Sequence, residues 1–290
     1  MTKVLIVGDL AVDIVTDMPR RFVIGGYTIL QPPKIVAAGV AGNMAWYLKQ
    51  LGIDPIVVAT VGDDSWGVFL KDQLAQAGIS TKLIRTSKML TGFFLLSVDN
   101  KGERTMIGSR SANTDLSVAA EEIVNARPQW IHLSGYSLLN RNYERVMKTV
   151  KRASEDLAVP ISTDLEGISA HGRHINLQGV TVFCNDKEFR MYFRSSPRKI
   201  AARIKHTIVV KAGARGCYLI ARHRLTHFPS VAKKIVDTTG AGDAFNSSYI
   251  ASILNGRDES AACRFANAFA AYKITQMGAK AVPTPNGLPY

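Results

Sequence analysis

Short apolar runs rich in β-branched residues alternate with segments of helical pattern along most of this sequence. Such runs are typical of buried strands, and their separation by amphipathic helices predicts a largely parallel sheet with helices on its faces. A chain of 290 residues is long enough to form one α/β domain with a large core. The expected strands are Val4 to Val7, Ile56 to Val61, Trp130 to Leu133, Ile161 to Asp164, Val180 to Phe183 and Thr207 to Val210.

Two stretches interrupt this alternation. Residues 14–36 are rich in Gly and Pro, and residues 91–109 hold two strand-like runs joined by Asn100-Lys101-Gly102, a turn suited to a hairpin. We interpret both as a small β-sheet lid inserted in an α/β core, with surface hairpins of no special function as the alternative. The core would then comprise residues 1–13, 37–90 and 110–290.

Composition limits the class of protein only in part. The 36 Lys and Arg against 23 Asp and Glu give a net charge of +13, which fits nucleic acid, an anionic substrate or a solvated basic surface equally. No apolar run reaches the roughly 20 residues of a membrane span, so we expect a cytoplasmic protein without a membrane partner. Three widely spaced cysteines predict buried, reduced thiols.

The segment from Asp237 to Phe245 carries the clearest chemistry. It is a turn of small residues that opens into an apolar helix reaching about Leu254, and such a turn predicts an anion hole formed by the backbone of Gly240, Ala241 and Gly242. Asp243 would lie beside a bound phosphoryl group, where its carboxylate can accept the proton of a substrate hydroxyl. A simple helix cap is the alternative for a lone Asp.

Other phosphate-binding classes lack their motifs here. The sequence contains no G-x-x-x-x-G-K-[ST] string, no G-x-G-x-x-G after the first strand, and no paired H-R-D and D-F-G motifs. These absences argue against a P-loop enzyme, a dinucleotide-binding enzyme and a protein kinase.

The Asp237 to Phe245 segment resembles the C-terminal signature of the ribokinase-like, or PfkB, family of carbohydrate and nucleoside kinases. Further landmarks follow in family order over nearly the whole chain. The resemblance implies a mostly parallel central sheet with a small β lid, ATP and Mg²⁺ as cofactors, and Asp243 as catalytic base. It also implies a homodimer formed through the lid.

Two N-terminal segments resemble the family's substrate-binding motifs. In Gly8 to Asp13, Asp13 matches a residue that holds substrate hydroxyls. In Ala38 to Asn43, the resemblance implies that Gly39 and Asn43 contact the substrate, with a helix cap as the alternative for Asn43. Ala38 replaces the first Gly of the family's pair, which would narrow the pocket or reflect a different backbone path.

Three further segments resemble the family's nucleotide site. Asn185 and Glu188 match an N-x-x-E motif that organises Mg²⁺, water and phosphate, with Glu188 acting through water, although alone they read as a helix start. Lys211 to Gly216 resembles the nucleotide-binding turn; Gly213 and Gly216 would admit the nucleotide, and Lys211, in place of a common Thr, would reach phosphate or point to solvent. Asn267 matches a residue of the adenine pocket, and buried helix packing is equally open.

Three charged residues complete the candidate site. Arg110 could pair with a substrate carboxylate or phosphate, or lie on the lid surface. Asp164 ends a strand at the sheet edge where α/β proteins bind ligands, so we expect it near the substrate. Asp237 matches a family residue that helps to hold K⁺, but Lys280 in the adjoining Gly278 to Ala281 loop argues against a cation there.

The substrate class stays open at this point. A pentose or hexose is the first expectation, a nucleoside the second, and a 2-keto-3-deoxygluconate-type sugar acid the third because of Arg110. A nucleoside base would need an apolar slot, which Phe22, Tyr27 and Phe94 could supply. A non-catalytic nucleotide-binding module and a nucleic-acid-binding protein are the different-class alternatives; the basic series from Arg190 to Lys205 fits a solvated helix face better than a nucleic-acid site.

Overall fold

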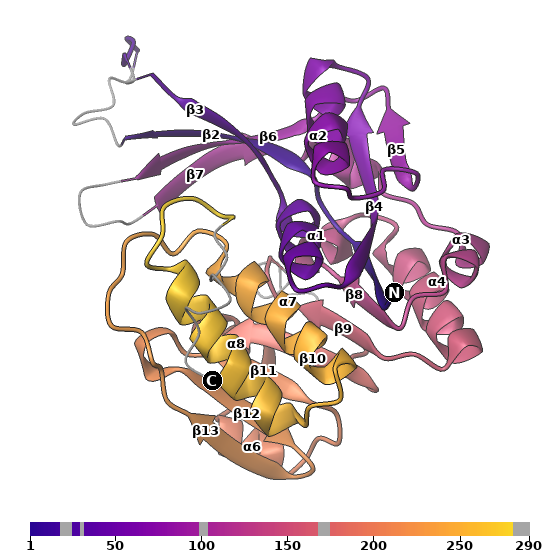
Figure 1. The fold of residues 1–290 in the computed structure, drawn as a ribbon, viewed down its shortest axis with the longest axis vertical. Coiled ribbons are helices and arrows are strands. Elements are labelled where there is room, and N and C mark those ends of the chain that lie inside the picture. The colour runs from indigo at the N-terminus through magenta and orange to yellow at the C-terminus, as the bar shows by residue number, and fades with distance from the viewer. Residues whose placement is uncertain (18–24, 30–31, 99–103, 168–174, 281–290) are drawn as a thin grey trace.

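The structure is a computed structural model that describes residues 1–17, 25–29, 32–98, 104–167 and 175–280. Within these residues the larger sheet has nine strands in the order β13-β12-β11-β10-β9-β8-β1-β4-β5, and Figure 1 shows it running through the centre of the molecule. In this spatial order, neighbouring strands from β11 to β5 pair in parallel, while β12 pairs antiparallel with both β11 and β13. The bounds are β1 (Lys3–Val7), β4 (Asp54–Gly62), β5 (Ile84–Ser87), β8 (Trp130–Leu133), β9 (Ile161–Asp164), β10 (Val180–Asn185), β11 (Ile208–Lys211), β12 (Cys217–Ala221) and β13 (Arg224–Phe228).

Helices cover both faces of this sheet because its central strands are apolar on both sides. Along β1, Val4 and Ile6 belong to one core, whereas Leu5 and Val7 belong to the other. The first core packs against α1 (Val40–Gln50), α2 (Ser65–Gln76), α7 (Ala241–Leu254) and α8 (Glu259–Lys273). The second packs against α3 (Ala120–Ala126), α4 (Tyr143–Leu157), α5 (Asp186–Phe193) and α6 (Pro197–Ala201).

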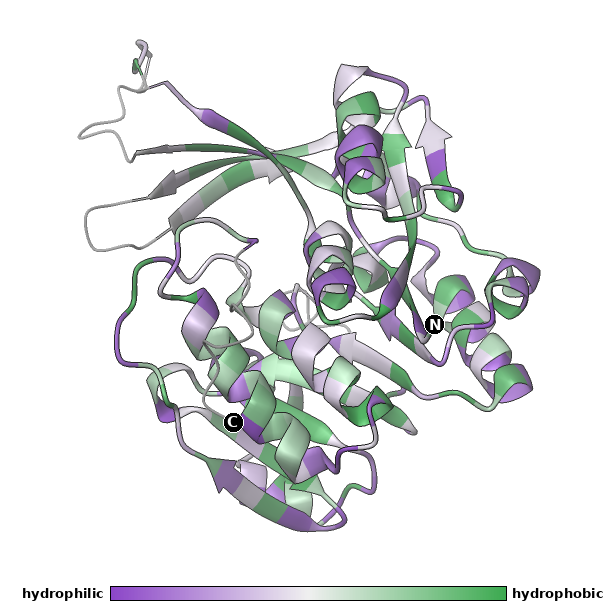
Figure 2. Ribbon diagram, in the orientation of Figure 1, coloured by the Kyte–Doolittle hydropathy of each residue, from purple (hydrophilic) through white to green (hydrophobic). Residues whose placement is uncertain are grey.

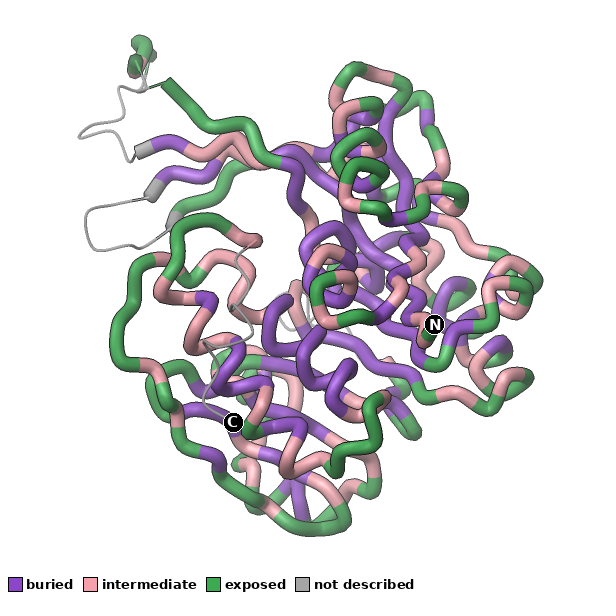
Figure 3. The backbone as a smooth tube through the Cα atoms, viewed as in Figure 1, coloured by how far each residue is buried: buried purple, intermediate pink, exposed green. Residues whose placement is uncertain are grey.

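The amphipathic patterns explain which helix faces are buried. Figure 2 shows the helices banded by hydrophobic and hydrophilic residues, and Figure 3 shows the larger sheet mostly buried and most helices partly exposed. In the basic segment, Phe189 and Ile200 are buried as the interleaved pattern predicts. The basic residues of that segment therefore form a solvated face over an apolar interior.

A second, four-stranded sheet projects from the larger one (Figure 1). Its order is β3-β2-β6-β7. β6 and β7 lie within the predicted stretch 91–109, whereas β2 begins before the stretch 14–36 and β3 ends after it. Their bounds are β2 (Ala11–Asp17), β3 (Lys34–Ala38), β6 (Gly92–Val98) and β7 (Arg104–Ser109). The predicted Asn100 to Gly102 turn lies outside the described residues.

The three cysteines lie inside the fold. Cys184, Cys217 and Cys263 are free and buried, as predicted. In the part of the chain that the structure describes, no helix is both long and apolar enough to cross a membrane.

Candidate active site

The N-termini of α1 and α7 meet and bring two predicted site residues into contact. The Asn43 side-chain amide donates a hydrogen bond to Asp243 Oδ2 over 2.8 Å, although the two residues are 200 positions apart. Both side chains are buried, with Asp243 7% exposed. Gly39 is the N-cap residue of α1, so Asn43 lies inside the helix and the helix-cap alternative for it is wrong.

Asp243 lies in an environment that disfavours its charged form. Burial raises its pKa to about 7, and the charges of Asp164 and Asp13 act in the same direction. The Asn43 hydrogen bond and the Lys211 ammonium oppose this shift. A carboxyl whose pKa lies near neutrality can both accept and release a proton at physiological pH.

The predicted anion-hole residues form the start of α7. Gly240 is its N-cap residue with φ 72°, and an added Cβ there would lie 2.6 Å from the Ala279 carbonyl oxygen. A Cβ at Gly242 would instead lie 3.4 Å from Lys211 Nζ and 3.9 Å from Glu166 Oε1. A side chain at position 240 would overlap the Ala279 backbone, so this position needs glycine. At Gly242 the missing side chain leaves the turn next to a cluster of charged side chains.

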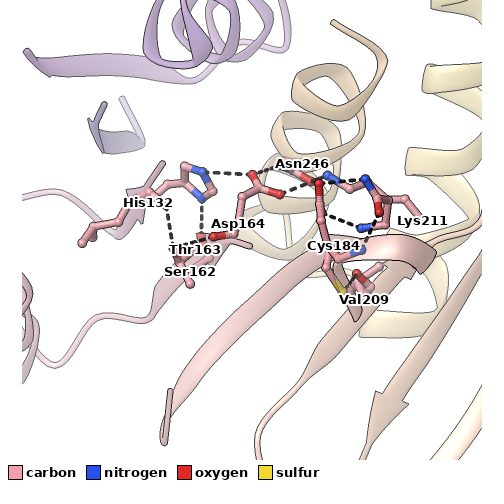
Figure 4. Close-up of polar contacts among 11 residues, drawn as sticks. His132, Ser162, Thr163, Asp164, Cys184, Val209, Lys211 and Asn246 are labelled. Carbon is pink, nitrogen blue, oxygen red and sulfur yellow. Dashed lines mark hydrogen bonds and ion pairs between the residues drawn. The ribbon is translucent and has the colours of Figure 1, made fainter. Parts of the chain in front are cut away.

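Lys211 is the centre of that cluster (Figure 4). Its ammonium bonds Asp164 Oδ1 at 3.0 Å and Asn246 Oδ1 at 3.3 Å, and only 16% of its side chain is exposed. Burial alone would lower its pKa, but the neighbouring carboxylates of Asp164 and Glu166 raise it instead. The alternative that Lys211 points to solvent is therefore wrong.

Asp164 lies beneath the site as the partner of Lys211. Its side chain is 1% exposed, its Oδ2 accepts a hydrogen bond from the Asn246 amide at 2.5 Å, and His132 Nε2 lies 3.6 Å from the same oxygen. Burial would raise the pKa of Asp164, yet Lys211 and His132 hold it below its usual value. Asp164 therefore holds the ammonium in place from a buried position.

Glu166 belongs to the same cluster and was not predicted. Burial raises its pKa well above the usual range, and the charges of Asp164 and Asp243 add to this rise. The signal in the sequence was a second acid two residues after Asp164, which ends its strand. Lys211 thus faces more carboxyl groups than it can neutralise, and such a site favours the arrival of another cation.

The Asn185 and Glu188 pair forms a reciprocal capping box at the start of α5. The Asn185 backbone N–H donates to Glu188 Oε2, and the Glu188 backbone N–H donates to Asn185 Oδ1, both at 2.8 Å. Burial raises the pKa of Glu188, and Lys211 opposes the rise. Within the described residues no group of three or more His, Cys, Asp or Glu could hold a metal ion. Glu188 fits Mg²⁺ only as one carboxylate beside a hydrated ion whose other ligands come from a nucleotide.

The predicted nucleotide residues Gly216 and Asn267 converge on one segment, 228–230. A Cβ at Gly216 would lie 2.0 Å from the Phe228 carbonyl oxygen, and the Asn267 amide donates to that same oxygen at 3.1 Å. Gly216 lies in the β11 to β12 turn and Asn267 on α8, so both elements pack against the end of β13. Among the described residues, no atom lies within 4 Å of a Cβ added at Gly213, so the turn is open to them on that side.

Near the predicted substrate residues, Arg110 is already paired. Its guanidinium donates to both carboxylate oxygens of Asp9, at 2.8 and 3.0 Å. Burial raises the pKa of Asp9 in spite of this pair. Asp13 lies on β2 close enough to Asp243 to raise the pKa of that carboxyl. Arg110 is thus bound to a buried acid and is not a loose arginine on the lid.

Gly39 shows how tightly the α1 start packs on the Asp9 backbone. Its φ is 91°, and an added Cβ would lie 2.3 Å from the Asp9 carbonyl oxygen. We expect Gly39→Ala to lower the free energy of unfolding by about 3 kcal/mol or more, because strain and overlap act together. Gly52→Ala is the control: φ is 76° and no atom of the described part of the chain lies within 4 Å of an added Cβ, so only about 1 kcal/mol of strain should appear. Urea unfolding measures both, and equal losses would show that the close approach does not matter.

Asp237, at the start of the same turn, is held by its own neighbours. Its Oδ1 accepts a hydrogen bond from the Thr239 backbone N–H at 2.8 Å, and its Oδ2 accepts one from the Gly278 N–H at 2.7 Å. Its carboxylate therefore ties the turn to the segment that follows α8.

Comparison with known proteins agrees with this geometry. An uncharacterized sugar kinase of Archaeoglobus fulgidus is 29% identical over 248 residues, covering 80% of this chain and 96% of the relative. An ATP-dependent ribose-1-phosphate kinase of Halopiger xanaduensis is 27% identical over 293 residues, covering 99% of this chain and 97% of the relative. Both relatives match this chain over nearly their full length.

Solved structures show the same fold. Arabidopsis thaliana ribokinase, complexed with ribose and ATP, superposes with a TM-score of 0.82 at 21% identity, over 97% of this chain and 95% of that one. A Burkholderia thailandensis nucleoside kinase in complex with inosine gives 0.77 at 22% identity, over 98% and 94%. The predicted α/β fold with a second, smaller sheet is therefore confirmed.

The model of one family, described as pfkB family carbohydrate kinase, matches residues 1–286. This match covers both sheets, the Asp237 to Phe245 signature and every residue of the site described above. The chain belongs to the pfkB family of carbohydrate kinases, which are phosphotransferases that act on hydroxyl groups.

Proposed function

We propose that this protein transfers the γ-phosphoryl group of ATP to a hydroxyl of a small sugar, with Asp243 as the base. One observation carries the proposal. Asp243 occupies the first turn of α7, next to the small-residue turn, and is buried with a pKa raised to about 7. A base needs this combination of a phosphate-binding backbone beside it and a proton affinity near neutrality.

The side chains around Asp243 have complementary tasks in this proposal. Asp13, Gly39 and Asn43 would bind the sugar, and the Asn43 amide would orient the Asp243 carboxylate. Asp243 would accept the proton of the attacking hydroxyl. The backbone N–H groups of Gly240 and Gly242 would donate to oxygens of the transferred group, joined by that of Ala241 once it leaves its 3.2 Å hydrogen bond to the Thr238 carbonyl. Lys211, next to Gly242, would balance their charge.

The nucleotide would lie along the Gly213 to Gly216 turn, with Asn267 fixing the segment beside it. Glu188 would bind hydrated Mg²⁺, which when bound neutralises charge on the phosphates. Burial raises the pKa of Glu166 and Glu188, and the charge of Asp164 raises both further. The carboxyl groups gathered around Lys211 support this assignment, because a bound cation would offset their mutual repulsion.

The second sheet would act as a lid that excludes water when the sugar is bound. Apolar side chains of its outer strands, Ile35 and Val36 on β3 and Met106 and Ile107 on β7, are exposed. They support a homodimer formed through this sheet. Light scattering of the purified protein tests it, since a monomer mass at micromolar concentration would refute the dimer.

A sugar is favoured over the other substrates. The bidentate pair between Arg110 and Asp9 already satisfies the guanidinium that suggested a sugar acid. For a nucleoside base, Tyr27 is 83% exposed, Phe94 is half-buried, and Phe22 lies outside the described residues. The curated relatives also act, by their names, on sugars or sugar phosphates.

The test is an ATP-consumption assay with Mg²⁺ across pentoses, hexoses, sugar phosphates, sugar acids and nucleosides, with the phosphorylated product identified by mass. Turnover with a sugar or sugar phosphate would support the proposal and choose the substrate. Turnover confined to nucleosides or sugar acids would replace it. The absence of any product together with normal ATP binding would favour a non-catalytic role.

A further inference from the structure

Lys273, the last residue of α8, is a buried cation that the proposed mechanism leaves without a task. Its side chain is 0% exposed, and its ammonium donates a hydrogen bond to the backbone carbonyl oxygen of Asp237 over 2.7 Å. A buried ammonium is unfavourable unless charge and hydrogen bonds compensate it. Its position next to the phosphate-binding turn therefore calls for a functional reason.

Asp237 links Lys273 to that turn in two ways. The carbonyl oxygen of Asp237 accepts a hydrogen bond from the Lys273 ammonium, while its carboxylate oxygens accept hydrogen bonds from the backbone N–H groups of Thr239 and Gly278. Burial would raise the pKa of Asp237, but these hydrogen bonds and the charge of Lys273 hold it below its usual value. The residue that begins the turn is thus fixed by a positive charge on one side and by backbone donors on the other.

The segment that follows α8 completes this arrangement. The Ile274 carbonyl accepts hydrogen bonds from the backbone N–H groups of Val236 and Asp237, and Ala279 lies against Gly240 so closely that no Cβ fits between them. Displacing Asp237 would consequently move Gly240 and the backbone donors that follow it. The position of the anion hole depends on what holds Asp237.

We propose that Lys273 is an internal cation that positions the Asp237 to Gly242 turn, in place of a bound monovalent ion such as K⁺. A carbonyl oxygen beside a carboxylate, as Asp237 presents, is a site for such an ion, and the Lys273 ammonium binds that carbonyl oxygen with the same charge. A second cation at this carbonyl would be repelled by the first. The inference rests on the proposed function, because it assumes that this turn binds the phosphoryl group.

The sequence suggested another lysine for this effect. Lys280 was expected to disfavour K⁺ binding because it lies in the Gly278 to Ala281 loop. In the structure its pKa is lowered by burial, and the charge that opposes this shift is that of Asp13. Lys280 therefore belongs to the predicted substrate side, and Lys273 is the cation at Asp237.

The test compares wild type with Lys273→Ala in K⁺ and in an equal ionic strength of tetramethylammonium. Wild-type turnover should be the same in both salts within twofold. Lys273→Ala should lose about 10- to 100-fold in kcat/KM for ATP in tetramethylammonium, and K⁺ or methylammonium should restore much of that loss. A residue that served only packing would not be rescued by a small cation.

Thermal unfolding in the same salts provides a readout that needs no turnover. The melting temperature of Lys273→Ala should rise specifically with K⁺, and that of wild type should not. If Lys273→Ala does not fold, Lys273→Gln keeps a hydrogen-bond donor without the charge and serves in its place. Wild-type stimulation by K⁺ of severalfold, or a variant indifferent to K⁺ in both measurements, would overturn the proposal. A protein that has no kinase activity but shows the expected melting pattern would instead count against the proposed function alone.

Discussion

An Asp243→Asn variant is expected to lose about 10²- to 10⁴-fold in kcat, because an amide cannot accept the proton of the attacking hydroxyl. Its affinity for ATP should change less than twofold, since asparagine has the same shape and can still accept the hydrogen bond from Asn43. Steady-state kinetics and a fluorescent-nucleotide titration measure the two quantities. Undiminished turnover would remove Asp243 as the base.

The same substitution has a predicted effect on stability, and its sign follows from the raised pKa. The usual pKa of 3.8 rises to about 7 in the folded protein, so between these values the folded state binds more protons than the unfolded chain. Stability from this group therefore falls as pH rises from about 4 to about 7 and stays low above it. Asp243→Asn should melt several degrees higher than wild type near pH 8, and the difference should vanish near pH 4.

Turnover of the wild type should show the opposite dependence on pH. Below about pH 7 the rate should fall about tenfold per unit as the carboxyl becomes protonated and can no longer act as a base. The apparent value belongs to the cluster, because Asp164 and Lys211 also influence Asp243. The small residual rate of Asp243→Asn is the control, since a fall in rate at low pH that survives in this variant would arise from the nucleotide or another group.

The stability prediction has its own contrary outcome. If Asp243→Asn melts lower than wild type near pH 8, the Asp243 carboxylate stabilises the fold.

The sequence predicted the large sheet closely where the strands are buried on both sides. β8 and β9 have the predicted bounds, Trp130–Leu133 and Ile161–Asp164, and every residue in them is buried. β10 extends two residues beyond the prediction, to Asn185, since its ladder with β11 continues after the apolar run stops. The helix at Asp243 was also predicted, because its small-residue turn and apolar run are contiguous.

The electrostatic part of the site could not be predicted in this way. Asp164 and Asn246 are hydrogen-bonded across 82 positions, and Lys273 reaches Asp237 across 36. Asp164 was expected near the substrate and Asp237 near a cation, but nothing in the sequence pairs Asp164 with Asn246 or Asp237 with Lys273. Only the packing of α7 and α8 on the sheet turns them inward, so their burial and the resulting pKa shifts are properties of the tertiary structure.

Replacing Lys211 by methionine should have the other large effect, on turnover and on stability together. Removing one partner of a buried ion pair leaves Asp164 uncompensated, which should lower the free energy of unfolding by about 3–5 kcal/mol. Turnover should fall at least about 10²-fold, because the transferred phosphoryl group loses the cation below Gly242. Urea unfolding and single-turnover kinetics measure the two losses.

The double variant Asp164→Asn with Lys211→Met separates the two roles of this lysine. Asparagine removes the stranded charge and can still accept the hydrogen bond from the Asn246 amide, so much of the lost stability should return. Turnover should not return, because the neutral pair supplies no positive charge to the phosphoryl group. If the double variant regained activity with stability, Lys211 would be only a counter-ion for Asp164. The charge balance at the anion hole would then have to come from the nucleotide's metal alone.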